Sequence, residues 1–454
     1  MNPPDGQARS APRAFVLDRL LSPFAEVHAG EAATALLMML NVFLLLTAYY
    51  IIKVVREPLI LAGGGAEVKS YSAAGQAVLL LALVPAYGAF ASRVDRAKLI
   101  TWVTLFFASN LVIFYLLAQA KVPYLGVAFF LWVGIFNLMI IAQFWAFAND
   151  VYSPEQGKRL FAIVGIGAST GAILGAWLAK QLIKPLGVYQ LMLVAAAILL
   201  ACIVLTRIVN ARERAARSLP GAAPRAEAPL GAEGGFKLVF SQRYLTLIAL
   251  LMLLLNFVNT NGEYVLGKSL TTVLGKMAAD GAAGAMSTSD WTKQQIGLFY
   301  ADYFWWVNLV GASFQLFVVS RVLTWFGVRA ALFVLPLIAL GGYGLLAVAP
   351  ILGFVKVAKI LENSTDYSLQ NTSRHALFLP TSREAKYKAK AAIDSFFVRG
   401  GDLLSTGLVF VGANLLALKP QGFAVVNIAL VLAWIVVVVM IGREHRKLTE
   451  KAPG

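Results

Sequence analysis

Residues 351–374 read ILGFVKVAKILENSTDYSLQNTSR, a stretch long enough to cross a bilayer as one helix. It carries polar and charged side chains where a lipid-facing span would be apolar: Lys356, Lys359, Glu362, Asn363, Asp366, Gln370 and Arg374. At about 100° per residue, all of these except Glu362 fall within an arc of about 80°. An ionisable group at mid-bilayer costs roughly 2.5 to 3.5 kcal/mol, so the stripe predicts a functional site that faces water or a ligand.

The composition excludes an ordinary soluble domain. Hydrophobic residues make up 59% of the 454-residue chain, charged residues make up 14%, and the mean hydropathy is +0.73. We predict an all-α membrane protein with twelve transmembrane helices, each about 20 residues or longer. The expected spans are residues 33–52, 72–91, 99–118, 123–148, 160–182, 188–208, 245–266, 296–319, 330–348, 351–374, 391–416 and 423–441.

Basic residues set the expected orientation. Most of the 39 Lys and Arg residues fall on the side that holds the N-terminus, which predicts that both termini are cytoplasmic in a bacterial inner membrane. A chain with both termini on the same side must cross the membrane an even number of times. The polar stretch 351–374 must therefore cross it as well. The net charge of +16 follows from this topology, and no nucleic-acid partner is expected. Residues 1–31 are polar and show no cleavable signal peptide.

The chain divides near its middle. Residues 210–235 are rich in Ala, Gly, Pro and charge without an apolar period, which is typical of a flexible linker. Ser92-Arg93-Val94 after the second span recurs as Ser320-Arg321-Val322 after the eighth. We therefore expect a cytoplasmic segment (1–31), a six-helix bundle (32–209), the linker (210–235), a second six-helix bundle (236–442) and a cytoplasmic tail (443–454). This layout resembles the major facilitator superfamily, whose substrate site lies at the midplane between the halves.

A charged loop between the second and third spans supports that resemblance. Residues 88–98 read GAFASRVDRAK and resemble the loop signature of the superfamily, a Gly followed by an Asp in an Arg-rich turn. We expect Arg93, Asp95 and Arg96 to form a charge latch that closes in one conformation and releases in the other. The alternative is a solvated loop that carries only positive-inside charge.

Catalytic and metal-binding motifs have no support in the sequence. Gly165-Ile-Gly167-Ala-Ser-Thr-Gly171 lacks the spacing of a nucleotide-binding loop, and the four-residue repeat of Gly167, Gly171 and Gly175 predicts close helix packing. Cys202 is the only cysteine, and the three histidines fall in terminal or loop segments. We expect neither an enzyme nor a bound cofactor or metal.

Ionisable residues at membrane depth predict what the site binds. The cationic candidates are Lys53, Arg56, Lys356, Lys359, Lys390 and Arg399, and the acidic ones are Glu57, Glu263, Asp302, Asp366 and Asp394. Some must pair, because an unpaired buried charge is too costly. The surplus of cations favours a small anionic solute, most simply a phosphorylated one. Two alternatives stay open: Lys53 could be an anchor at the end of its helix, and Lys390 could belong to the basic ladder Lys386, Lys388, Lys390.

Four motifs together resemble the ATP:ADP antiporter family of nucleotide transporters found in plastids and obligate intracellular bacteria. They are Tyr49-Tyr-Ile-Ile-Lys53-Val-Val-Arg56-Glu57, Phe147-Ala-Asn149, Asn261-Gly-Glu263 leading to Lys268, and Lys388-Ala-Lys390-Ala-Ala-Ile-Asp394. The resemblance implies that Lys53, Glu263 and Lys390 are important for transport. One departure is present: the family's exchangers carry a glutamate early in the helix that ends in Phe-Ala-Asn, and residues 123–148 here contain no acid.

These observations predict a transporter that moves an anionic solute by alternating access, most simply by nucleotide exchange. The expected substrate-binding residues are Lys53, Arg56, Glu263, Lys356, Lys359, Asn363, Asp366 and Lys390. The bilayer is the only other partner expected, and we expect a monomer. Two alternatives remain, namely proton-coupled transport of another solute, in which Glu263 or Asp366 titrates, and a membrane scaffold or receptor that transports nothing.

Overall fold

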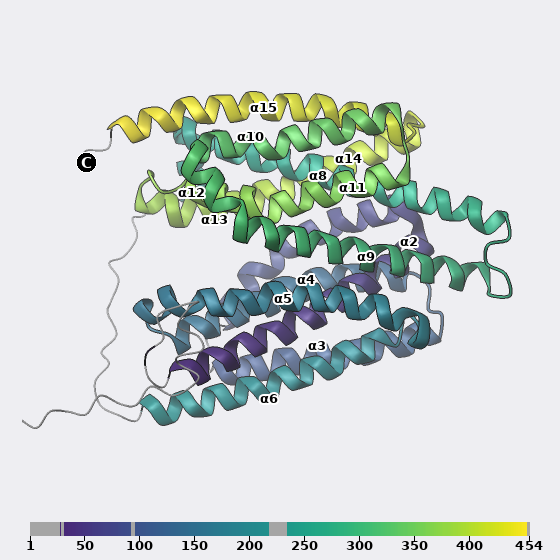
Figure 1. The fold of residues 1–454 in the computed structure, drawn as a ribbon, viewed down its shortest axis with the longest axis horizontal. Helices are drawn as coiled ribbons and strands as arrows, with labels where there is room; N and C mark the ends of the chain where they lie inside the picture. Colours follow the sequence, from purple (N-terminus) through teal and green to yellow (C-terminus); the bar gives the residue numbers. More distant parts are fainter. Residues whose placement is uncertain (1–27, 29–30, 92–95, 218–233, 452–454) are drawn as a thin grey trace, which may run out of the picture.

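The computed structural model describes residue 28 and residues 31–91, 96–217 and 234–451, and all regular structure in these ranges is helical (Figure 1). The first half contains α2 (Glu31–Ala91), α3 (Arg96–Gln119), α4 (Leu125–Val151), α5 (Pro154–Leu186) and α6 (Leu191–Arg217). The second half begins with α7 (Gly235–Ser241), α8 (Arg243–Ala279), α9 (Thr288–Phe317) and α10 (Val319–Val348). It continues through α11 (Leu352–Thr365), η1 (Asp366–Gln370), α12 (Asn371–Ala376), η2 (Ala385–Ala389), α13 (Lys390–Ala392), η3 (Ile393–Phe397), α14 (Val398–Phe410), η4 (Val411–Leu415) and α15 (Pro420–Lys451).

The predicted all-α membrane architecture is confirmed. Among the described residues, nine helices are long and apolar enough to cross a membrane. The expected spans 33–52 and 72–91 both lie in α2, whereas the span 296–319 lies on α9 and the polar span 351–374 lies on α11, η1 and α12. Neither α9 nor the polar helix is among the nine, because both carry more polar residues than such a span usually holds. The number twelve therefore stays a prediction.

Helix α2 reverses direction within its 61 residues. A straight helix of that length would be about 90 Å long, roughly three times the thickness of a bilayer core. The break falls at Gly65, whose φ of 77° and ψ of −177° suit only glycine. Glu57 before the break accepts a hydrogen bond from Lys69 after it, at 2.6 Å between Oε2 and Nζ, so the two legs face each other.

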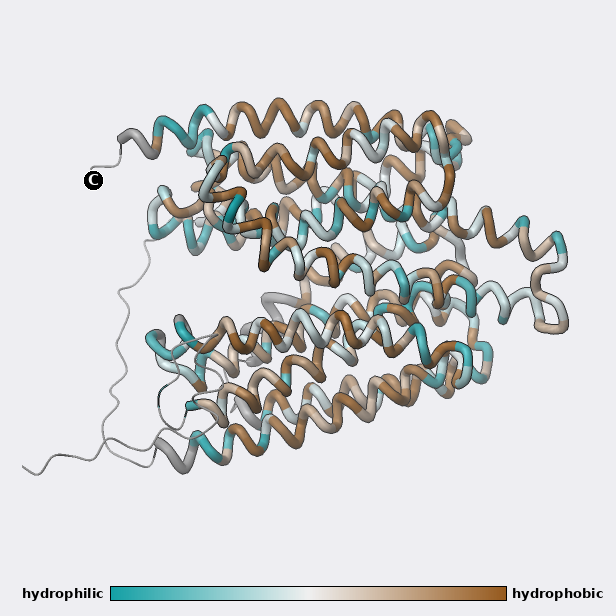
Figure 2. Tube along the Cα trace, viewed as in Figure 1, coloured by the Kyte–Doolittle hydropathy of each residue, from teal (hydrophilic) through white to brown (hydrophobic). Residues whose placement is uncertain are grey.

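Two groups of helices make up the molecule. Helices α2 to α6 form one bundle and helices α8 to α15 form the other, and the groups diverge toward the end where α6 ends and α15 terminates (Figure 1). Near Gly65 the bundles touch, through α5 against α9, α2 against α8 and α9, and α14 against α2. The apolar bodies and hydrophilic ends of the helices fit a membrane that encloses the middle of both bundles (Figure 2).

Small residues let α5 approach α2 closely. A Cβ added to Gly171 would lie 2.2 Å from the Phe43 carbonyl oxygen, and Gly167 and Gly175 make equivalent approaches to Met39 and Thr47. The hydroxyl of Thr47 donates to the Gly171 carbonyl at 3.2 Å across the same contact. The packing role predicted for this glycine repeat is therefore confirmed.

Gly171→Val should lower the thermal stability of the purified protein. The added methyl groups have no space against the backbone of α2, and overpacking typically costs about 1–3 kcal/mol. Gly165→Val is the matched control, because a Cβ at Gly165 on the same helix meets nothing within 4 Å. Melting curves in one detergent provide the measurement, and equal losses for the two variants would contradict this account of the interface.

Candidate functional site

A cavity of about 300 Å³ lies between the two bundles. Both legs of α2, together with α4, contribute from the first bundle, and α8, α9, α11, η1 and α14 contribute from the second. Its polar and charged lining residues are Tyr49, Lys53, Arg56, Lys69, Ser70, Gln76, Asn256, Asn259, Thr260, Glu263, Tyr264, Asn363, Tyr367, Arg399 and Asp402. The cavity gathers four cations and two carboxylates, and these charged side chains come from both halves of the chain.

One fully buried carboxylate organises the first-bundle side of the cavity. The Glu57 side chain has no exposed area and accepts hydrogen bonds from Arg56 and from Lys69, the latter at 2.6 Å. The guanidinium of Arg56 also lies 4.8 Å from the ring centre of Phe130 on α4. Glu57 therefore holds two cations against the cavity from behind, and their combined charge exceeds its own.

Lys53 lies one turn before Arg56 and differs from it in having no acidic partner. Its ammonium lies 4.3 Å from the ring centre of Phe304, 5.2 Å from that of Tyr50 and 5.9 Å from that of Tyr367. Within the described ranges, no carboxylate lies within ion-pair distance of it. Aromatic faces attract a cation without forming an ion pair with it, so the Lys53 ammonium is open to an anionic ligand.

Glu263 on α8 is the main acidic group on the opposite side. Its Oε1 accepts hydrogen bonds from the Tyr303 hydroxyl at 3.1 Å and the Asn363 amide at 3.0 Å. The ammonium groups of Lys359 and Lys69 lie 3.8 and 4.0 Å from its carboxylate oxygens. Because Lys69 comes from α2 and the other partners come from the second bundle, Glu263 links the two halves across the cavity.

The predicted substrate-binding residues separate into two groups. Lys53, Arg56, Glu263 and Asn363 line the cavity together, whereas Lys356, Lys359, Asp366 and Lys390 are not among its lining residues. Lys359 is buried next to it and contacts Glu362 at 3.1 Å and the Asn259 side chain at 2.7 Å.

The other residues predicted to act in transport lie farther along their helices. Lys356 pairs with Asp302 at 2.5 Å, and Lys390 pairs with Asp394 at 3.0 Å. Asp366 begins the π-helical segment η1 and is partly exposed. Of the predicted latch, Arg93 and Asp95 lie outside the described residues, and Arg96 begins α3 with a side chain that is not described.

Sequence reasoning missed Lys69. The expected spans ended at residue 52 and resumed at residue 72, so Lys69 fell between them and was assigned no role. In the structure it is 8% exposed and shares Glu57 with Arg56. The available signal was Gly63-Gly64-Gly65, which is typical of a chain reversal. A reversal brings together residues that lie equally far before and after it. Glu57 and Lys69 are such residues, because each lies six positions from Gly63.

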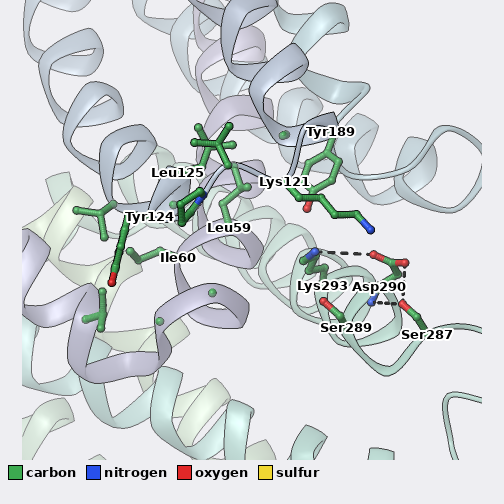
Figure 3. A pocket seen from close by; sticks show the side chains of 18 residues that line it. Leu59, Ile60, Lys121, Tyr124, Leu125, Tyr189, Ser287, Ser289, Asp290 and Lys293 are labelled. Atoms are coloured by element: carbon green, nitrogen blue, oxygen red, sulfur yellow. Dashed lines mark hydrogen bonds and ion pairs between the residues drawn. The ribbon is translucent and has the colours of Figure 1, made fainter.

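A second cavity, of about 560 Å³, lies beyond the point where the bundles touch. Leu59, Ile60 and Leu125 form one part of its wall, and the other part carries the ion pair of Lys293 with Asp290 at 3.8 Å (Figure 3). It is larger than the central cavity but lacks the converging buried charges. We therefore place the candidate site in the central cavity.

Polar contacts close the seam between the bundles on the Gly65 side of the site. Glu67 accepts hydrogen bonds from Lys268 at 2.7 Å and from the Tyr264 hydroxyl at 3.0 Å, both on α8. Asp302 on α9 binds Lys180 of α5 as well as Lys356 of α11. The described contacts between the bundles thus gather at one end, and the site is shut off from that end.

Comparisons with known proteins agree with the motifs. Residues 303–445 match the family described as the TLC ATP/ADP transporter. ADP,ATP carrier protein 1 of Chlamydia trachomatis is 24% identical over 339 residues, which cover 66% of this chain and 61% of that protein. The namesake from Rickettsia bellii is 23% identical, with 69% of this chain and 68% of the relative covered. The resemblance to the ATP:ADP antiporter family is confirmed. The matched residues cover less than two thirds of the length of the chlamydial relative.

Solved structures show the fold. A nucleoside transporter, NupG, superposes with a TM-score of 0.62 at 14% identity, covering 90% of this chain and 98% of its own. A bacterial homologue of the iron transporter ferroportin, in an inward-facing state, gives a TM-score of 0.63 at 14% identity and the same coverage. The chain therefore has the two-bundle fold of major facilitator transporters and is a multi-pass membrane protein.

Glu57→Gln should destabilise the protein far more than Lys53→Gln. Removing the Glu57 charge leaves Arg56 and Lys69 buried without their shared partner, and breaking a buried pair costs about 3–5 kcal/mol. Lys53→Gln removes a cation with no acidic partner and should leave the melting temperature unchanged or raised. Thermal melts of both variants in the same detergent test this difference, and a destabilised Lys53→Gln protein would show that the lysine is paired after all.

Glu67→Gln should loosen the contact between the bundles at the Gly65 end. A partly exposed ion pair contributes at most about 1 kcal/mol, so the equilibrium between closed and open states should shift by about fivefold or less. Spin labels at Lys184→Cys and Lys276→Cys, in a Cys202→Ala background, should report a larger population of long distances.

The matched control for that experiment is Glu31→Gln, which breaks an ion pair with Arg159 inside the first bundle. It should leave the distance distribution unchanged. An identical distribution for Glu67→Gln and the unmodified protein would show that these contacts do not hold the seam closed.

Proposed function

We propose that this protein is a secondary transporter that exchanges nucleotide-class anions across a bacterial inner membrane by alternating access. The observation that carries the proposal is the uncompensated ammonium of Lys53, held in a cavity between two bundles next to the cations that Glu57 positions. The TLC relatives are named as ADP,ATP carriers, and their names support a nucleotide substrate for this chain.

The charges of the cavity favour an anion bearing phosphate. Lys53, Arg56, Lys69 and Arg399 line it, against the carboxylates of Glu263 and Asp402 and the buried carboxylate of Glu57 behind. This leaves one positive charge in surplus among the described residues. Lysine and arginine side chains that other residues hold in position are suited to donate hydrogen bonds to phosphate oxygens. The rings of Tyr49, Phe304 and Tyr367 also line the cavity and provide faces against which a base could stack.

The same surplus favours exchange over free uniport. Without substrate, the protein would have to change conformation with an uncompensated cation in the low-dielectric interior of the membrane. A bound anion neutralises that cation. The substrate then lowers the cost of both directions of the conformational change, and the return step also needs an anion. Glu263 accepts two hydrogen bonds and lies near two ammonium groups. This arrangement stabilises the charged carboxylate, so Glu263 is poorly suited to carry a proton.

We further propose the orientation and domain boundaries predicted from the sequence. With both termini cytoplasmic, the diverging end of the bundles faces the cytoplasm and the sealed Gly65 end faces outward. Lys390, near the diverging end, would then attract the substrate as it enters, and Lys356 would release Asp302 when the outer end opens. Arg93, Asp95 and Arg96 would act as the latch that closes the cytoplasmic end. Lys359 and Asp366 would rearrange as α11 and η1 move, and the working unit would be a monomer.

Exchange can be measured directly with reconstituted protein. Liposomes loaded with ADP should take up labelled ATP, and Lys53→Met should reduce the initial rate by about tenfold or more, because a charge-assisted hydrogen bond contributes about 1.5–3 kcal/mol. Lys276→Met is the matched control, because Lys276 is an exposed lysine on α8 away from both cavities.

Three outcomes of that assay would contradict the proposal. Uptake that ignores the internal nucleotide would rule out exchange. Uptake that collapses with a protonophore, and persists without any counter-substrate, would indicate proton coupling instead. Lack of uptake in the unmodified protein, with no effect of Lys53→Met on any cellular phenotype, would favour a scaffold or receptor.

A further inference from the structure

A third cavity, of about 870 Å³, lies on the second bundle at the diverging end, away from the central site. Helices α10 and α15 pack against each other there, at the outer edge of the bundle (Figure 1). Its basic lining residues are Arg243, Arg329, Arg443, Arg446 and Lys447, and Glu444 is the acid among them. This cavity therefore carries a large positive excess that the transport site does not use.

The remaining wall of the cavity is apolar. Phe333 lies one turn beyond Arg329 on α10, and Val439 lies one turn before Arg443 on α15, both toward the middle of the membrane. Val438 and Met440 continue that surface, and Phe326 at the rim is 66% exposed. The hydrophilic end of α15 meets its apolar body at this level (Figure 2). One cavity thus offers cations at one end and a hydrocarbon-like wall at the other.

Several contacts hold this arrangement in place. The Arg329 side chain lies over Gly442, where an added Cβ would be 3.8 Å from the arginine Cδ. Glu444 accepts a hydrogen bond from Lys447 at 2.9 Å and lies 3.9 Å from Arg243, so it aligns two of the cations. Trp325, 70% exposed next to Phe326, marks the level where aromatic side chains meet the membrane–water boundary.

We propose that this cavity binds an anionic phospholipid of the surrounding membrane. The phosphate of the headgroup would lie among Arg329, Arg443 and Lys447, and an acyl chain would lie along Phe333 and Val439. Basic pockets between membrane helices are suited to such headgroups, and the apolar wall selects a lipid over a free phosphate. A lipid that bridges α10 and α15 stabilises the packing of the second bundle.

The test uses the full-length protein purified in a mild detergent with phosphatidylglycerol or phosphatidylcholine. Native mass spectrometry should show that the unmodified protein retains phosphatidylglycerol in preference to phosphatidylcholine, and phosphatidylglycerol should raise its melting temperature. Arg329→Gln with Arg443→Gln should reduce the retained phosphatidylglycerol about tenfold or more and abolish the rise, because both substitutions remove charge-assisted contacts to phosphate.

Arg207→Gln with Arg212→Gln is the matched control, because these exposed arginines lie on α6 and outside the cavity. The control pair should retain the lipid and its thermal effect. Glycerophosphate, which has no acyl chains, should leave the melting temperature unchanged. A higher melting temperature with glycerophosphate would indicate that the cavity binds a soluble anion instead. Equal loss in both pairs, or no preference in the unmodified protein, would overturn the proposal. Size-exclusion profiles that match the unmodified protein establish that the variants are folded.

Discussion

The central site depends on the pairing of Glu57 with Arg56 and Lys69. A carboxylate with no exposed area is tolerated in a membrane protein only when cations offset its desolvation, and two of them converge on it. The two cations together carry one positive charge more than Glu57 neutralises. The three side chains therefore form a positive surface as well as a structural contact. Lys53 adds to that surface without a counter-ion. The selectivity argued for the cavity follows from this unequal pairing.

The reversal at Gly65 connects the site to the seam between the bundles. Lys69 lines the cavity, and Glu67, two residues earlier, holds α8 through Lys268 and Tyr264. The Ser70 carbonyl accepts a hydrogen bond from Thr406 on α14. One short stretch of α2 therefore carries both a cation that lines the cavity and the contacts that hold the bundles together at the Gly65 end. A ligand that draws Lys69 away from Glu263 alters both at once, which is a direct route from binding to conformational change.

The sequence predicted the fold class and the glycine packing of α5, and four of the eight residues that it predicted to bind substrate line the cavity. Each of these predictions depends on a regular period or on charge at membrane depth. Sequence reasoning failed where a local irregularity decides the geometry. The π-helical segment η1 changes the rotation per residue after Thr365, so a uniform wheel over residues 351–374 overstates how many polar side chains share one face. Lys69 escaped notice because hydropathy registers its charge but not the partner that a chain reversal brings to it.

The first bundle also decides how positive the cavity is. The family resemblance implies a glutamate early in α4, yet residues 123–148 contain no acid and α4 instead presents Phe130 to the face of Arg56. An aromatic ring stabilises the guanidinium and leaves its charge intact, whereas a carboxylate would cancel the single surplus charge counted among the described residues. The empty site here is therefore more cationic than one with that acid. A more cationic site takes more negative charge to neutralise it, so the absence of an acid from α4 favours binding of a more highly charged anion in this cavity.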